Sequence, residues 1–261
     1  MHQNFFQKNG YVIVKDNLNI IKKLRGHITS LIKKNNKKLK KESDENIINN
    51  FHKYYSKKNL NDIRFKLYNN INLIKEFDQL YYKSAQPVLD ELIGNEVAMQ
   101  KKINLSIQMP KDPDSLLDMH SDIYAGESPF QVVVWIPLVD VSGTKSMFFT
   151  NPKTNKKLNN LVLNSKNKTT RQIYEKNKKS FKFLNIKFGE ILIFSPLILH
   201  GNVVNKTKET RFSLNCRFKS LLSPYDVVVK SHRNIPQFYR PINIKPMTKI
   251  GFKYLMKYEK N

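Results

Sequence analysis

Two histidines and one aspartate in this chain are residue types that together could hold a metal ion. His120 and Asp122 are separated by one residue, and His200 comes much later, after an apolar run. Two neutral imidazoles and a carboxylate on one face of a metal leave its other face open, as in non-haem Fe(II) sites that activate oxygen. We therefore predict that these three residues bind one metal ion.

Each residue also has a simpler interpretation. Asp122 could cap a turn and hydrogen-bond to His120, and a histidine that ends an apolar run is commonly a satisfied core residue. On a strand, however, residues i and i+2 point to the same side, so His120 and Asp122 would face one interior. The pair and His200, each at the end of a predicted strand, together favour the metal interpretation.

Residues 211–218 predict a strand with one polar and one apolar face. Its polar face carries Arg211, Ser213, Asn215 and Arg217. This face could lie in water, as in an ordinary amphipathic strand, or it could line the cavity of a closed barrel. A guanidinium buried in such a cavity needs an anion as partner, and Arg211 could pair bidentately with an acidic cosubstrate.

A second stretch repeats the small polar pattern and predicts another strand, whose polar face could line the same cavity. It alternates polar with apolar residues over 104–109, and its polar members are Asn104, Ser106 and Gln108.

The elements that must position these residues change character along the chain. A short helix or turn and then a strand are predicted over 4–15, a helix over 18–34, a loop over 35–46, and two helices over 60–94 broken near Pro87. Strands follow at 104–109, 130–138, 147–149, 184–186, 191–194, 197–204 and, as the final strand, 211–218. Residues 151–180 are interpreted as a long insertion with a helix near 169–179.

Helices followed by short strands indicate a mainly β fold with an N-terminal helical layer. We predict a double-stranded β-helix, which is a cupin-like jelly roll. Residues 1–261 are expected to form a single domain. It would comprise a helical layer at about 16–94, a β core at about 95–220 and a tail, 221–261, that wraps the outside.

The net charge of +25, from 46 Lys and Arg against 21 Asp and Glu, is compatible with nucleic acid, anionic lipid or acidic ligands. The lysines are nevertheless scattered along the chain, and their densest run, 33–41, is typical of a solvated helix face and loop. Frequent lysine, asparagine and isoleucine together are typical of A/T-rich coding. Nucleic acid is therefore not expected as a partner.

Cys216 is the only cysteine, which rules out an intrachain disulfide and suits a reducing compartment. No basic region followed by a long apolar stretch opens the chain, and no apolar run has the length of a membrane span. We expect a cytoplasmic location without membrane association. The sequence predicts no oligomeric state.

Several motifs resemble Fe(II)/2-oxoglutarate-dependent oxygenases of the phytanoyl-CoA dioxygenase superfamily. The similarity covers roughly residues 4–220, and the stretch 200–218 is most similar to members from aminoglycoside and surface-carbohydrate gene clusters. The motifs are Phe5 to Val14, His120-Ser121-Asp122, Val134-Trp135-Ile136-Pro137-Leu138, Gly189 to Phe194, and His200-Gly201-Asn202.

The resemblance implies that the metal is Fe(II) and that Arg211 binds the distal carboxylate of 2-oxoglutarate. Gln108, Asn202 and Trp135 match the cosubstrate neighbourhood of the superfamily, whereas Arg217 is not a position that it requires. The implied activity is a dioxygenase that uses O2 to hydroxylate or otherwise oxidise a small molecule, such as a carbohydrate-linked one. Ascorbate is a candidate reductant. Desaturation, epimerisation and ring closure are related outcomes, and the carboxylate ligand argues against a halogenase.

Two rival functions stay open. The Arg-x-Ser-x-Asn-x-Arg pattern at 211–217 is similar to a strand of nucleic-acid dealkylases with the same cofactors, but the spacing from His200 to Arg211 is shorter and no base-flipping loop is evident. A non-catalytic jelly roll that binds an anionic sugar or a partner protein is the rival from another class.

Overall fold

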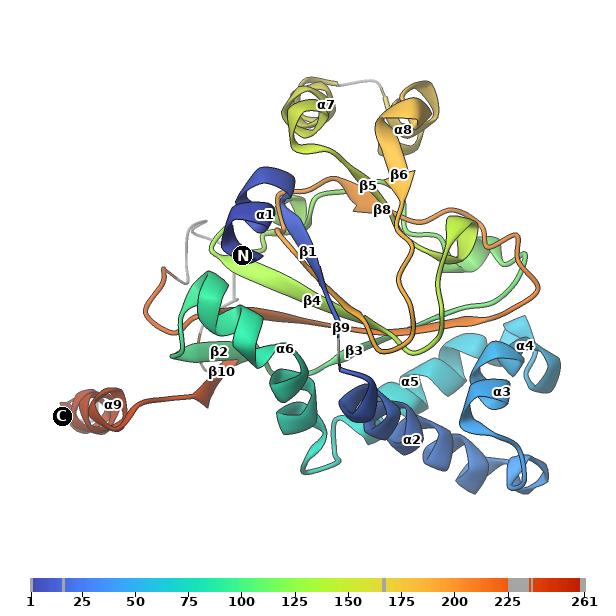
Figure 1. The fold of residues 1–261 in the computed structure, drawn as a ribbon, viewed down its shortest axis with the longest axis horizontal. Coiled ribbons are helices and arrows are strands. Elements are labelled where there is room, and N and C mark those ends of the chain that lie inside the picture. Colours follow the sequence, from blue (N-terminus) through green and yellow to red (C-terminus); the bar gives the residue numbers. More distant parts are fainter. Residues whose placement is uncertain (1, 16, 166–167, 225–234, 236, 259–261) are drawn as a thin grey trace.

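The computed structural model describes residues 2–15, 17–165, 168–224, 235 and 237–258, and two antiparallel sheets form its core (Figure 1). The large sheet has the order β1-β7-β4-β9-β2-β10, with β3 also paired to β9, and the small sheet has the order β6-β5-β8. Together they form the predicted double-stranded β-helix. The strands are β1 (Tyr11–Val14), β2 (Val97–Gln100), β3 (Asn104–Gln108), β4 (Gln131–Pro137), β5 (Phe148–Thr150), β6 (Phe181–Phe183), β7 (Ile191–Phe194), β8 (His200–Gly201), β9 (Arg211–Ser220) and β10 (Tyr239–Asn243).

Strand β9 is the centre of the large sheet. One of its edges pairs with β4 over seven positions, and the other pairs first with β3 and then with β2. Its apolar face is fully buried against the helices, where Phe212 contacts Phe51 and Phe218 contacts Tyr81. Because side chains alternate along a strand, its polar face must point to the other side of the sheet.

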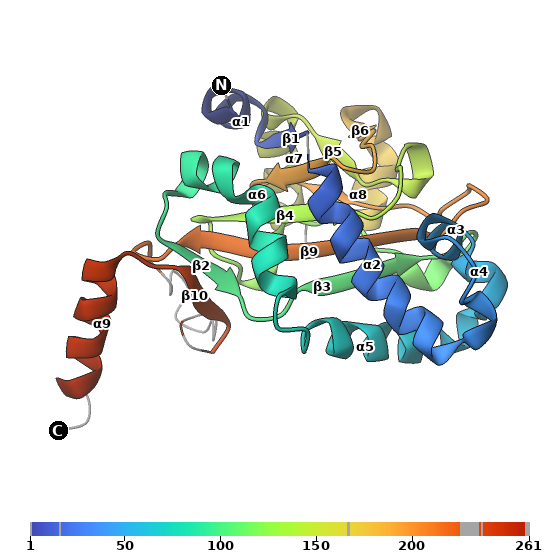
Figure 2. The ribbon, with the colours of Figure 1, turned by 60° about the horizontal axis from the view of Figure 1, so that its bottom comes forward.

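The helices form the predicted N-terminal layer. Helices α2, α5 and α6 cover one face of the large sheet (Figure 2), and the apolar stripe of α2 buries Ile21, Leu24, Ile28 and Ile32 there. The helices up to β2 are α1 (His2–Asn9), α2 (Leu18–Asn35), α3 (Asp44–Asn49), α4 (Phe51–Tyr54), α5 (Leu60–Ile71) and α6 (Phe77–Ile93).

Two helix predictions are corrected. Pro87 lies inside α6 and does not end it, and the break between α5 and α6 falls at 72–76. A proline inside a helix costs about 3 kcal/mol, but the buried stripe continues through it with Ala85, Val88 and Leu89. Burial of that stripe offsets the lost hydrogen bond. The predicted loop at 35–46 contains a short 3-10 turn at Lys37–Leu39 and the start of α3.

The strand predictions also need correction. Of 197–204, only His200–Gly201 is a strand, and of 184–186 only Ile186 pairs, in an isolated bridge with Val141. Strand β2 was missed. The insertion 151–180 forms two helices, α7 (Pro152–Asn164) and α8 (Thr170–Lys176), on the side of the molecule away from α2 (Figure 1).

The end of the chain is not simply a wrapping tail, and β9 is not the final strand. Strand β10 adds an edge to the large sheet next to β2, and α9 (Pro246–Tyr258) then projects from the body (Figure 2). The prediction for 225–234, 236 and 259–261 lies outside the described residues. Across the described residues, none of the helices combines the length and the apolar character needed to cross a bilayer.

Candidate metal centre

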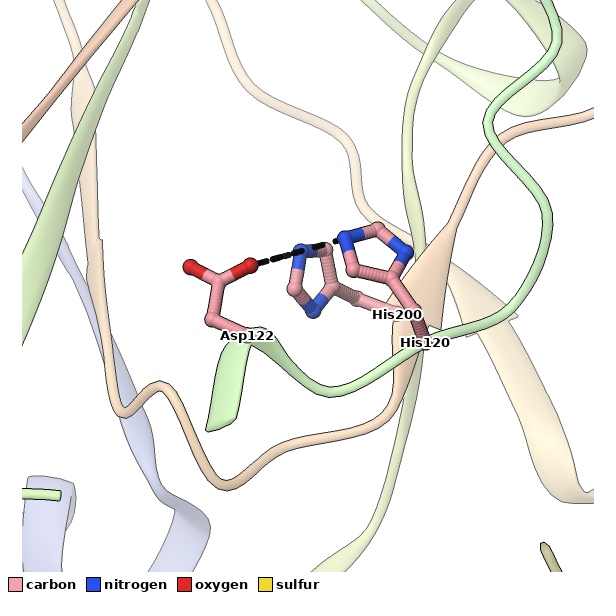
Figure 3. A group of neighbouring side chains, drawn as sticks. All are labelled: His120, Asp122 and His200. Atoms are coloured by element: carbon pink, nitrogen blue, oxygen red, sulfur yellow. Dashed lines mark ion pairs between the residues drawn. The ribbon is translucent and has the colours of Figure 1, made fainter. Parts of the chain in front are cut away.

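His120 and His200 are fixed opposite each other by their own backbones. The two residues form an isolated antiparallel bridge, in which each backbone N–H donates to the other's carbonyl oxygen at 2.9 Å. Their rings are consequently neighbours, with centroids 4.3 Å apart (Figure 3). Residues far apart in the sequence therefore present two imidazoles on one side of the bridge.

Asp122 lies next to the two imidazoles, but it belongs to a different kind of element from the predicted strand. It is the first residue of a 3-10 helix, η4 (Asp122–Ala125), and not part of a strand. Ser121 before it has extended backbone, and its hydroxyl donates to the carbonyl of Pro196 at 2.8 Å. The carboxylate still points toward the imidazoles (Figure 3), with Oδ1 3.5 Å from Nε2 of His120 and 3.8 Å from Nε2 of His200.

The hydrogen bonds of the two rings determine which nitrogen faces this carboxylate. Nδ1 of His120 lies 2.8 Å from the carbonyl of Asp118, and Nδ1 of His200 lies 2.9 Å from the carbonyl of Ile198. Because a carbonyl only accepts, Nδ1 carries the hydrogen in each neutral ring, and the lone pair of Nε2 faces Asp122. Three lone pairs thus converge, and their ligand atoms all lie within 4.8 Å of one another. A divalent metal ion fits this donor set.

The electrostatics keep His200 and Asp122 in their metal-binding protonation states. Burial, and then the charge of His120, lowers the pKa of His200 to about 4, so its ring is neutral at pH 7. Burial alone would raise the pKa of Asp122, but its contacts with the two imidazoles and the nearby guanidinium of Arg217 hold that pKa well below its usual range. The carboxyl is therefore ionised.

The three residues line a cavity of about 530 Å³ that also contains Arg211. Arg211 is only 3% exposed, and burial lowers the pKa of its guanidinium to about 10. Its Nη2 makes one long contact, 3.5 Å, with the hydroxyl of Ser106, whereas Nε and Nη1 have no hydrogen-bond partner among the described residues. A buried cation with unmade hydrogen bonds is suited to an anionic ligand.

The other predicted cosubstrate residues differ in whether their side chains still have unmade hydrogen bonds. Trp135 lines the cavity. Gln108 is opposite Arg211 in the β3–β9 register, and its amide oxygen has no partner among the described residues. Asn202 also lines the cavity, but its amide oxygen accepts from the backbone of Leu117 and its amide group donates to the carbonyl of Ser115.

The predicted polar face of β9 does point into the cavity. Asn215 and Arg217 line it together with Arg211, and Ser106 contributes from β3. Ser213 is buried on the same strand but is not part of the lining. Arg217 ion-pairs with the ligand candidate Asp122, with Nη2 3.3 Å from Oδ2.

Other cavity residues carry no pattern that sequence reasoning could have used. Part of the wall comes from α5 and the turn before it, and part from the loop after β3. These polar residues are Lys57, Asn61, Arg64, Asp112, Asp114 and Ser115. Asp112 is 1% exposed, and its Oδ2 has no hydrogen-bond partner among the described residues.

Comparisons with known proteins agree with this geometry. The family model described as phytanoyl-CoA dioxygenase (PhyH) matches residues 6–213. Similar solved structures include a non-haem monooxygenase, the ThoJ–Ni complex, with TM-score 0.53 and 13% identity over 84% of this chain and 77% of that chain. HygX from Streptomyces hygroscopicus with nickel and 2-oxoglutarate bound has TM-score 0.51 and 10% identity over 85% and 87%. EvdMO1 has TM-score 0.55 and 15% identity over 84% of this chain and 49% of that chain. At these identities the structures show a shared fold, and no curated protein sequence matches the chain.

Proposed function

The chain belongs to the phytanoyl-CoA dioxygenase family, and from that premise we propose that it hydroxylates a polar small molecule at the cavity described above. The enzyme is an Fe(II)- and 2-oxoglutarate-dependent dioxygenase. When bound, these two groups supply oxidation of a C–H bond by O2, coupled to decarboxylation of 2-oxoglutarate to succinate. The residues of the chain bind and orient the reactants and exclude water.

We assign the iron to His120, Asp122 and His200. The observation that carries the proposal is the convergence of three lone pairs within 4.8 Å, with both Nδ1 hydrogens already donated to backbone carbonyls. Such backbone acceptors fix the tautomer and ring orientation of metal-binding histidines. All three residues line the cavity, where cosubstrate and substrate would bind.

Arg211 is assigned to the distal carboxylate of 2-oxoglutarate. It lines the same cavity as the three metal-site residues, and two of its nitrogens lack partners among the described residues. A carboxylate at this position would satisfy the buried charge with paired hydrogen bonds. Gln108 is on the same face of the sheet as Arg211, so its free amide oxygen lies in the same neighbourhood. Asn202 is better explained as a brace for residues 115–117, because its side chain is already hydrogen-bonded.

The polar residues that line part of the cavity favour a polar substrate. They carry charged and amide groups from α5 and from the loop after β3, and they include Arg64, Asn61 and the buried Asp112. An acyl chain placed there would desolvate these groups without making hydrogen bonds, which is unfavourable. A hydroxyl-rich molecule, such as a carbohydrate-linked metabolite, would hydrogen-bond to them. The family match over 6–213 favours this function over nucleic-acid dealkylation.

The proposal is tested by succinate formation from 2-oxoglutarate under air, with and without Fe(II). Activity should need both Fe(II) and O2, and His200→Ala should abolish it while the circular dichroism spectrum stays unchanged. Lys176→Ala, on the exposed surface of α8, is the matched control and should keep full activity. Full activity of folded His200→Ala would refute the assigned metal site. A polar substrate should raise succinate formation and gain the mass of one oxygen atom.

A further inference from the structure

Arg217 lines the cavity and contacts three other side chains. Its Nη2 lies 3.3 Å from Oδ2 of Asp122, its Nε lies 3.0 Å from Oε1 of Glu127, and its Nη1 donates to Oε1 of Gln100 at 3.2 Å. Both carboxylates are nearly buried, at 7% and 3% side-chain exposure. One guanidinium on β9 therefore holds two buried acids that come from the segment before β4.

Glu127 is itself held from its other side. Its Oε2 accepts from the amide of Gln131, and the amide oxygen of Gln131 accepts from the hydroxyl of Tyr239 on β10. The acid that orients Arg217 is thus tied to the edge of the large sheet. This leaves little freedom for the guanidinium to move away from Asp122.

The position of Asp122 explains why such a contact is needed. The two histidines are locked by the backbone bridge between them, but Asp122 follows that bridge on a short 3-10 helix. Sheet pairing therefore does not fix the direction of its carboxylate. In the described part of the chain, Arg217 is the partner of Oδ2, and Oδ1 is the oxygen that faces both imidazoles.

We propose, on the basis of the proposed function, that Arg217 is a positioning residue that makes Asp122 bind the metal through Oδ1 alone. With Oδ2 engaged by the guanidinium, the carboxylate cannot chelate the metal with both oxygens. The coordination position that a chelating carboxylate would take then stays free for 2-oxoglutarate or O2. Arg217 also places a positive charge next to the buried carboxylate of Glu127.

The test uses Co(II) as a spectroscopic probe of the full chain, with Arg217→Met as the variant. The visible absorption of bound Co(II) reports coordination number and geometry without turnover. In Arg217→Met we expect a changed Co(II) spectrum, and the Kd values for Co(II) and for 2-oxoglutarate should rise about 10- to 100-fold, as for other partners of metal ligands. Arg240→Met is the matched control, because Arg240 pairs with Asp78 of α6 and neither residue lines the cavity.

The control should keep the wild-type spectrum and both affinities. If folded Arg217→Met also keeps them, the positioning role is overturned while the metal assignment stands. If the wild-type chain binds neither Co(II) nor Fe(II), the proposed function itself fails, and this proposal fails with it.

If Arg217→Met does not fold, as judged by circular dichroism, Arg217→Lys decides. Lysine keeps the positive charge but cannot contact Asp122, Glu127 and Gln100 at once, because it lacks the planar fork. We expect an altered Co(II) spectrum in this variant too. A wild-type spectrum with wild-type 2-oxoglutarate affinity would overturn the proposal.

Discussion

Replacing Arg211 with methionine should stabilise the protein free of metal and cosubstrate, although it should abolish tight binding of 2-oxoglutarate. The guanidinium is buried and has no carboxylate partner among the described residues, and burial lowers its pKa from 12.5 to about 10. At pH 7, below both values, the charged form is disfavoured in the folded state by about 3 kcal/mol, at roughly 1.36 kcal/mol for each pKa unit. An apolar side chain of similar length removes that cost, as replacements of buried charges often do.

The effect on 2-oxoglutarate binding has the opposite sign. Truncating one partner of a buried, hydrogen-bonded charge pair costs about 2–5 kcal/mol. Since about 1.4 kcal/mol corresponds to a tenfold change, the Kd for 2-oxoglutarate should rise roughly 30-fold to several thousand-fold. The Fe(II) affinity measured without cosubstrate should change little, because Arg211 makes no contact with His120, Asp122 or His200 that the structure shows.

Thermal unfolding with and without 2-oxoglutarate, under nitrogen and with Mn(II) in place of Fe(II), measures both effects. The free variant should melt up to about 6–12 °C above wild type, given roughly 2–4 °C per kcal/mol for chains near this size. At a concentration 100 times its wild-type Kd, 2-oxoglutarate should stabilise wild type by about 2.7 kcal/mol, and the same concentration should stabilise the variant by less than about 1 kcal/mol. A variant that keeps the wild-type response to 2-oxoglutarate would refute the role of Arg211.

Three further predictions concern the fold around the site. In Gly201→Ala, the added Cβ would lie 2.8 Å from the carbonyl of Leu117 and 2.8 Å from the ring of Phe148. This overpacking should destabilise the protein by about 1–3 kcal/mol and weaken metal binding through the adjacent His200. A variant with the wild-type melting temperature and the wild-type Kd for Co(II) would contradict this prediction. In the metal-free protein, the pKa of His200 is lowered from 6.5 to about 4. Between these pH values the unfolded state therefore binds more protons, and the free energy of unfolding should fall by up to about 3 kcal/mol as the pH drops from 6.5 to 4. Urea unfolding should show this fall for wild type and a smaller one for His200→Gln, and an equal pH dependence of the two proteins would exclude it. We also propose that residues 1–261 fold as one domain, since the helices and the large sheet share one core; calorimetry should show a single unfolding transition, and two separate transitions would argue for two domains.

Several parts of the fold follow directly from local patterns in the sequence. The apolar spacing of α2 indicates a helix, and the long apolar run of β4 indicates a buried strand. The bounds of both elements were predicted within a few residues. The predictions failed for elements whose structure is determined by contacts with distant parts of the chain. Strand β2 is only four residues long and fully buried, and β10 contains Pro241, so neither has an alternating pattern to find. Pro87 was taken as a helix end because the burial that overrides its local cost is a tertiary property.

The three candidate metal ligands were chosen from their types and order, and the structure brings them together, but the reason given for the position of Asp122 was wrong. A strand would have placed His120 and Asp122 on one side through the pleat. The structure instead turns the chain into a 3-10 helix after the His120–His200 bridge. The contacts of Arg217 with Glu127 and Gln100 join segments far apart in the sequence, and no spacing rule could have predicted them. The cavity wall from α5 was missed for the same reason.

Charge explains how one strand can supply both of the arginines beside the site. Asp122 and Glu127 contribute two negative charges, and Arg211 and Arg217 contribute two positive charges, so these four side chains are together neutral. Arg217 is committed to the two acids, whereas Arg211 has no acidic partner among the described residues. Fe(II) and the dianion of 2-oxoglutarate would add equal and opposite charge. Fe(II) and 2-oxoglutarate could therefore bind together without leaving a buried charge uncompensated. This requires that Arg217 stay paired with the two acids while Arg211 remains free to bind the carboxylate of 2-oxoglutarate.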